Sequence, residues 1–136
     1  MNRVLVDTGP LLAILLDTEQ HHAACVRYFL DSGARLATCW PVLTEAAWLL
    51  QNRPDIFANL LATVEKRGLE ILPLSADDVP YIATLMRRYR NLRLQLADAA
   101  LVHLANRERI DTIFTLDRRD FSIVRGAHGK RFTLVP

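Results

Sequence analysis

Apolar residues along the chain form short runs that alternate with longer segments of helical periodicity. The short runs predict five strands, at residues 3–6, 35–40, 69–74, 112–115 and 132–135. The longer segments repeat their apolar positions once per helical turn. They predict six helices, at residues 11–16, 19–30, 41–50, 55–67, 76–90 and 94–108. Glycine, proline and capping residues lie at several of the boundaries, as expected for helix and strand ends.

The predicted strands are short and apolar, without the polar alternation of a half-exposed sheet. Such strands are typical of a parallel sheet that is covered on both faces. The alternation of strands and helices therefore predicts an α/β fold, with a central parallel sheet of about five strands and helices on both faces. No linker, repeat or low-complexity tract appears, so we expect one domain over residues 1–136.

Composition excludes several classes of protein. The chain is 51% hydrophobic and 24% charged, which is typical of a globular protein and not of a disordered one. Its longest apolar run, residues 10–16, is much shorter than the roughly 20 residues of a membrane span, and no secretory signal is recognisable. Cys25 and Cys39 are too few for a disulfide framework. We therefore expect a cytoplasmic protein that does not contact a membrane.

The formal net charge of +2 is close to neutral, but all cationic residues except Lys66 and Lys130 are arginine. Arginine suits bidentate contacts with phosphates and carboxylates, which favours a nucleic acid or an acidic partner. A GC-rich genome would produce the same bias, so both explanations stay open.

Two carboxylates fall on apolar faces of predicted helices. Asp98 lies on the apolar stripe of the helix at 94–108, and Glu45 lies among the apolar residues of the helix at 41–50. A carboxylate on a core-facing stripe is costly unless it is paired, protonated or bound to a cation. Each acid lies near the start of its helix, where the helix dipole favours the charged form.

Two further acids directly follow predicted strands. Asp7 comes after the strand at 3–6, and Asp117 comes after the strand at 112–115, so both are expected at the carboxyl edge of the sheet. Each acid alone has an ordinary explanation as a helix cap or an ion-pair partner. Clustered carboxylates repel one another, however, and Mg²⁺ or Mn²⁺ would relieve this repulsion through oxygen ligands. Such ions also orient water and stabilise charge on a phosphodiester.

Four segments in this order resemble the PIN-domain ribonucleases, most of all the small VapC-like toxins of toxin–antitoxin pairs. They are VLVDTGP at 4–10, Thr44-Glu45, LADAA at 96–100 and TLDRRDF at 115–121. The resemblance covers nearly the whole chain and implies a PIN-like fold. It further implies a catalytic metal site formed by Asp7, Glu45, Asp98 and Asp117. The resemblance also implies that the hydroxyl groups of Thr8 and Thr115 support this site.

The last of these motifs leaves one position open. The family accepts an acid or an amide at either of two places three residues apart, so Asp120 is a further candidate ligand after Asp117. Asp120 could instead cap a helix that starts before Phe121. Arg118 and Arg119 adjoin Asp117, and we expect them to contact substrate phosphate or the acidic tail of an inhibitory partner.

The resemblance implies a metal-dependent endoribonuclease that hydrolyses RNA with Mg²⁺ or Mn²⁺ and is inhibited by an antitoxin protein. We also expect a homodimer. Two alternatives stay open: an RNA-processing nuclease without an antitoxin, and a non-catalytic interaction module. Three alternatives stay open for one set of apolar residues: part of the core, a groove for a partner helix, or a dimer face. These residues are Tyr28, Phe29, Leu30, Trp48 and Phe57.

Other motifs have simpler explanations. Asp7-Thr8-Gly9 matches the aspartic protease motif, but that fold is all-β and this chain is rich in predicted helices. His21 or His22 with Cys25 could hold zinc, although a solvated helix face is expected because no second ligand pair follows.

The helix end near residue 90 carries several arginines, and His103 is polar on an apolar helix. His103 lies opposite the apolar stripe of its helix and is expected at the surface. The arginines surround Tyr89 and indicate either a phosphate track with a stacking aromatic or a solvated helix end; they are Arg87, Arg88, Arg90 and Arg93.

Overall fold

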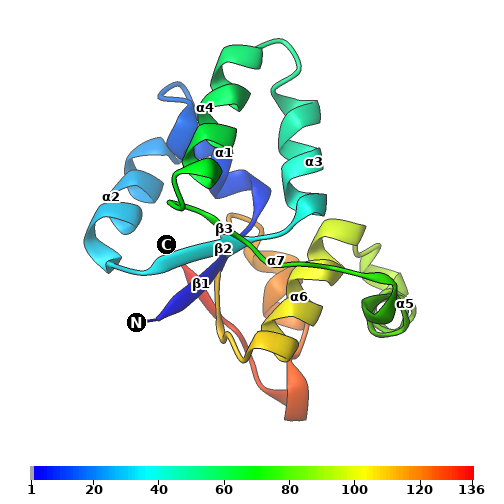
Figure 1. Ribbon diagram of the computed structural model, residues 1–136. Coiled ribbons are helices and arrows are strands. Elements are labelled where there is room, and N and C mark those ends of the chain that lie inside the picture. The colour runs from blue at the N-terminus through cyan, green and yellow to red at the C-terminus, as the bar shows by residue number, and fades with distance from the viewer. Residues whose placement is uncertain (1) are drawn as a thin grey trace.

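The computed structural model describes residues 2–136 and is built around one parallel five-stranded sheet (Figure 1). The order of the strands is β3-β2-β1-β4-β5, and every neighbouring pair is parallel. The strands are β1 (Arg3–Val6), β2 (Arg35–Thr38), β3 (Glu70–Ile71), β4 (Thr112–Phe114) and β5 (Thr133–Val135). The predicted α/β fold with a parallel sheet of five strands is confirmed.

Seven α-helices connect and cover the strands. The first four lie together on one side in Figure 1, and are α1 (Thr8–Leu15), α2 (His22–Ser32), α3 (Trp40–Leu49) and α4 (Pro54–Glu65). The other three lie on the opposite side, and are α5 (Val79–Arg88), α6 (Leu96–Glu108) and α7 (Arg118–Ile123). Three short 3-10 turns complete the fold, η1 (Ala76–Asp78), η2 (Arg90–Leu92) and η3 (Ala127–Gly129). This division follows from the right-handed crossovers between parallel strands.

The direction of winding reverses at the centre of the sheet. From β1 the chain moves outward through β2 to β3, and it then returns to place β4 on the other side of β1. The backbone N–H of Asp7 donates to the carbonyl of Phe114 at 2.9 Å, which joins the carboxyl ends of β1 and β4. In open α/β sheets this switch point is where ligands bind.

Local chemistry accounts for several differences from the predicted boundaries. The strand expected at 69–74 is limited to β3, because Pro73 lacks the N–H that would continue the ladder. The strand expected at 35–40 ends at Thr38, since Trp40 begins α3 with Pro41 in its first turn. The helix expected at 76–90 divides into η1, α5 and η2. Helix α7 was not among the six predicted helices, although a helix start before Phe121 was the alternative explanation for Asp120.

Helix α6 passes through the middle of the molecule and is buried on most of its circumference. It packs against α5 on one side and against α3 on another. Its buried residues include Ala99, Ala100, Leu101 and Val102, each with no exposed surface. The alanines allow the backbones of neighbouring elements to approach closely. A helix that is apolar nearly all round is typical of a core position.

The expectation that His103 lies at the surface is wrong. His103 is 6% exposed, and its Nε2 lies 2.7 Å from Oδ1 of Asp78. Arg107 donates to the same oxygen at 3.1 Å, and the Asp78 carboxylate also accepts from the backbone N–H of Ser75. These contacts hold the pKa of Asp78 well below its usual value. The side of α6 opposite the sheet is therefore covered by α5.

Cys25 and Cys39 are buried free thiols, as the low cysteine content indicated. Within residues 2–136, no helix combines the length and the apolar character that a membrane crossing requires.

Candidate functional site

Asp7 lies at the carboxyl end of β1 and caps the N-terminus of α1. Its side chain is held from two sides: the backbone N–H of Thr8 donates to Oδ1 at 2.8 Å, and the Thr115 hydroxyl donates to Oδ2 at 3.0 Å. The residue is only 8% exposed. Burial is the main cause of its raised pKa, which the two hydrogen bonds oppose and the charge of Asp117 reinforces. A positive ion nearby would favour its charged form.

Thr115 connects Asp7 with Asp117. The threonine is fully buried just after β4, and its hydroxyl oxygen accepts from the backbone N–H of Asp117 at 3.0 Å while donating to Asp7. Because a hydroxyl that accepts from an N–H is free to donate its own proton, this chain sets the direction of both hydrogen bonds. The two strand ends are thereby held in a fixed relation at the switch point.

Asp98 is the third residue of α6 and accepts from the backbone N–H of Gln95 at 3.3 Å. Burial, together with the charges of Asp7, Asp117 and Glu45, raises the pKa of Asp98 to about 7, against the opposing effect of the Gln95 hydrogen bond. The carboxylates are therefore close enough to act on one another. Nearby negative charge of this kind is what a bound cation would neutralise.

Glu45 lies on α3 and faces the same site. The expectation that it lies on a core-facing stripe is wrong, because the residue is largely exposed. Its pKa is nevertheless raised, first by partial burial and then by the charge of Asp7. Glu45 therefore lies at the rim of the site, while Asp7 lies at its floor.

Asp117 caps α7, and its Oδ1 accepts from the backbone N–H of Asp120 at 3.4 Å. Asp120 is thus placed in the first turn of α7, and its charge is not among those that raise the pKa of Asp98. Arg118 donates to the carbonyl of Pro136, while the exposed side chain of Arg119 has no hydrogen-bond or ion-pair partner within residues 2–136. Both arginines lie beside Asp117 at the start of α7.

The hydroxyl of Thr8 is the single buried side-chain polar atom without a hydrogen-bond partner within residues 2–136. It lies near the Glu45 carboxylate and opposes the rise in the pKa of that group. In the described part of the chain no three His, Cys, Asp or Glu side chains stand close enough to enclose an ion. Mg²⁺ and Mn²⁺ do not require such a cage, because they bind through one or two carboxylates and keep several waters. The oxygen-only donors and the unpaired hydroxyl fit an ion of this kind.

The histidines near the start of α2 do not form a site. His22 Nδ1 lies 2.6 Å from the carbonyl oxygen of Ala13, His21 precedes the helix, and Cys25 is fully buried.

The structure also shows what Tyr89 contacts in the basic segment after α5. Tyr89 accepts from the backbone N–H of Arg125 through its hydroxyl, which places it in a structural contact.

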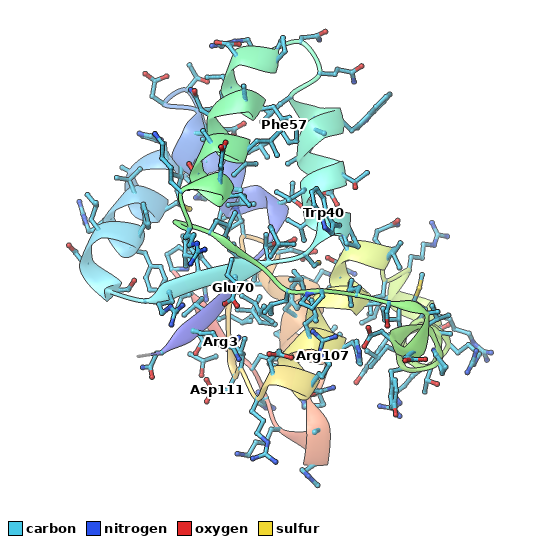
Figure 2. The ribbon with its side chains drawn as sticks, in the orientation of Figure 1. Arg3, Trp40, Phe57, Glu70, Arg107 and Asp111 are labelled. Carbon is cyan, nitrogen blue, oxygen red and sulfur yellow. The ribbon has the colours of Figure 1, made fainter. Side chains whose placement is uncertain are left out.

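One polar feature was missed by sequence reasoning. Asp78, His103 and Arg107 border a cavity of about 620 Å³ between α5 and α6, away from the four carboxylates (Figure 2 labels Arg107). In the structure Ser75 and Asp78 form a capping box at η1, and no sequence signal connected Asp78 with His103. That contact depends on how α5 packs on α6.

Comparisons with known proteins agree with this architecture. Residues 4–127 match the family model of the PIN domain. Ribonuclease VapC26 of Mycobacterium tuberculosis is 38% identical over an alignment that covers 98% of this chain and 100% of the relative.

Three solved structures share the fold. VapC20 of Mycobacterium tuberculosis, described as a toxin that cleaves the sarcin-ricin loop, superposes with a TM-score of 0.77 at 18% identity, over 89% of this chain and 96% of its own. A toxin–antitoxin complex from Klebsiella pneumoniae superposes with a TM-score of 0.67 at 19% identity, over 98% of this chain and 96% of its own. VapBC2 of Rickettsia felis, bound to a DNA fragment from its promoter, superposes with a TM-score of 0.65 at 17% identity, over 97% of this chain and 96% of its own. The matches in family model, sequence and fold together show that this chain belongs to the PIN-domain family.

Proposed function

We propose that the chain is a metal-dependent endoribonuclease and the toxin of a toxin–antitoxin pair. The observation that carries this proposal is the convergence of four carboxylates at the switch point of the sheet, those of Asp7, Glu45, Asp98 and Asp117. An acidic site alone would repel a phosphodiester, so its chemistry requires a cation. The 38% identity to a ribonuclease, and the toxins among its structural relatives, support the same activity.

Asp7 and Asp98 are the proposed inner ligands for Mg²⁺ or Mn²⁺, with Glu45 and Asp117 at the rim. Thr115 orients Asp7, and Thr8 offers its unpaired hydroxyl to an ion or its water. Asp120 stays a further candidate ligand. A divalent cation at this place supplies positive charge that offsets the charge developing on the phosphodiester. Arg118 and Arg119 are placed to contact substrate phosphates beside Asp117.

The proposed partners are an RNA substrate, an antitoxin protein and a second copy of the chain. Antitoxin complexes among the structural relatives favour the toxin over an RNA-processing nuclease that has no inhibitor. The mutual action of four carboxylates favours an enzyme over a non-catalytic module. We further propose that residues 1–136 act as one nuclease domain, and that it works in the cytoplasm, where such an RNA substrate is found.

An RNA cleavage assay tests the activity. The purified chain is expected to cleave single-stranded RNA with Mg²⁺ or Mn²⁺ and not in EDTA. Asp98→Asn should lower the rate about 100-fold or more, because it removes a charged ligand from the site. The matched control is Asp31→Asn, which changes an exposed acid at the end of α2. Equal cleavage by the unaltered chain and Asp98→Asn would show that the site is wrongly assigned.

A further inference from the structure

A trough of about 480 Å³ lies between the outer face of α3 and the start of α6, next to the candidate carboxylates. It is lined by Trp40, Trp48 and Glu45 on α3 and by Gln95 and Leu96 at the start of α6. We refer to it as the tryptophan trough. Trp40 lies at the end of α3 nearer to α6 (Figure 2).

The two indoles are unusually exposed for their size. Trp40 is 59% exposed and Trp48 is 68% exposed, and Leu96 across the trough is 53% exposed. Trp40 and Trp48 are eight positions apart in α3, so they lie on the same helix face two turns apart. Aromatic residues usually bury most of their area, and exposed apolar surface of this kind indicates a binding surface.

Two exposed arginines lie in the chain segment that leads to the trough. Arg90 and Arg93 are in and directly after η2, and Gln95, which lines the trough, follows two residues later. Both arginines are exposed. In the described residues neither guanidinium group has a carboxylate within 4.0 Å or makes a hydrogen bond; the bond at Arg93 is from the Gln95 side chain to its backbone carbonyl. Guanidinium groups without acidic partners are suited to phosphates.

We propose that the tryptophan trough binds unpaired RNA bases next to the scissile phosphate, and that Arg90 and Arg93 hold neighbouring phosphates of the same strand. This inference rests on the proposed ribonuclease function. Recognition of single-stranded RNA combines aromatic platforms for the bases with a basic track for the backbone. Here the indoles line the trough together with Glu45, and the arginines lie just before Gln95 in the chain.

Charge favours RNA over a second copy of the chain as the occupant. An apolar partner face would bury the indoles but would also cover the Glu45 carboxylate and the unpaired arginines, which costs desolvation energy. A single RNA strand avoids that cost. Its bases stack on the indoles, while its phosphates pair with the guanidinium groups.

The indoles provide their own reporter, because the chain contains only two tryptophans and both line the trough. Decauridylate is titrated into the unaltered chain in EDTA, where metal-dependent cleavage is blocked, and intrinsic tryptophan fluorescence is followed. We expect saturable quenching. A double-helical RNA with the same number of phosphates should quench much less, because its bases are not free to stack.

Variants separate stacking from charge. Trp40→Ala and Trp48→Ala should each weaken decauridylate binding about five- to 150-fold, and Trp40→Phe should recover most of the affinity. Arg90→Gln and Arg93→Gln should weaken single-stranded and duplex binding alike and reduce the salt dependence of both. The matched controls on α2, which lies across the molecule from α5 in Figure 1, are Phe29→Ala and Arg27→Gln, and both should bind normally.

Three results would contradict the proposal that the tryptophan trough binds RNA bases. The first is no quenching at RNA concentrations that saturate cleavage. The second is unchanged affinity in both tryptophan variants. The third is fluorescence that depends on protein concentration without RNA, together with loss of a dimer in Trp48→Ala, which would assign the trough to a second copy. Cleavage by the unaltered chain is measured separately. Cleavage without RNA binding in the trough would contradict this inference alone, whereas RNA binding in the trough without cleavage would contradict the proposed nuclease function.

Discussion

Asp98 occupies the first turn of α6, where the backbone N–H of Gln95 and the helix dipole favour its charged form. Burial and the charges of Asp7, Asp117 and Glu45 oppose this and raise its pKa to about 7. At neutral pH the metal-free site therefore holds repelling carboxylates or binds a proton. The same surroundings that make the charged form of Asp98 unfavourable in the metal-free protein make the binding of a cation beside it favourable.

The raised pKa of Asp98 predicts a pH-dependent stability of the metal-free protein. Because the folded chain holds this proton more tightly than the unfolded chain, the free energy of unfolding should fall as pH rises from about 4 to about 7. Above about pH 7 this contribution levels off. Asp98→Asn should reduce the dependence and be more stable than the unaltered chain at pH 8 in EDTA.

Urea unfolding in EDTA at pH 5 and pH 8 measures this difference. The exposed Asp31→Asn serves as control and should follow the unaltered chain at both pH values. Parallel pH curves for Asp98→Asn and the unaltered chain would contradict the assignment of Asp98 to a charged cluster.

At the scale of elements, α6 connects the site with the core. Its first turn carries Asp98, while its later turns are buried between α3, α5 and the sheet. Periodicity predicted this helix and its apolar stripe. The burial of His103 was missed, because it depends on α5 folding back onto α6 rather than on the helix itself.

Loss of packing on α6 should therefore destabilise the whole fold. Leu101→Ala removes a fully buried side chain and should lower the free energy of unfolding by about 2–5 kcal/mol. Leu30→Ala makes the same chemical change on α2, where the residue is 72% exposed, and should cost less than about 1 kcal/mol. Chemical denaturation of both variants provides the measurement, and equal losses would contradict the central position of α6.

At the scale of the whole molecule, the order of the strands assembles the site. Because β1 and β4 are neighbours, Asp7 and Asp117 meet although they are far apart in the sequence. Helices α3 and α6 approach the same edge from the two sides of the sheet and contribute Glu45 and Asp98 (Figure 1). Each acid is thus supplied by a different element of the fold.

A cation bound by this assembly should stabilise the folded chain by mass action. Mn²⁺ at 100 times its dissociation constant would add about 2.7 kcal/mol, equivalent to a rise in Tm of several degrees. Asp7→Asn and Asp98→Asn should reduce the rise, whereas Asp31→Asn should retain it. A thermal unfolding series with Mn²⁺ or EDTA tests this, and an equal rise in all four proteins would place the ion elsewhere.

The sequence by itself determined the class of fold and the identity of the candidate acids. Strand and helix periodicity are local properties, and a residue that directly follows a strand, as Asp7 and Thr115 do, lies at the carboxyl edge of any parallel sheet. Tertiary structure decided the rest. It exposed Glu45, buried His103 against Asp78 and placed both tryptophans in one trough with Glu45. These outcomes depend on contacts between elements, which the pattern within any one element does not contain.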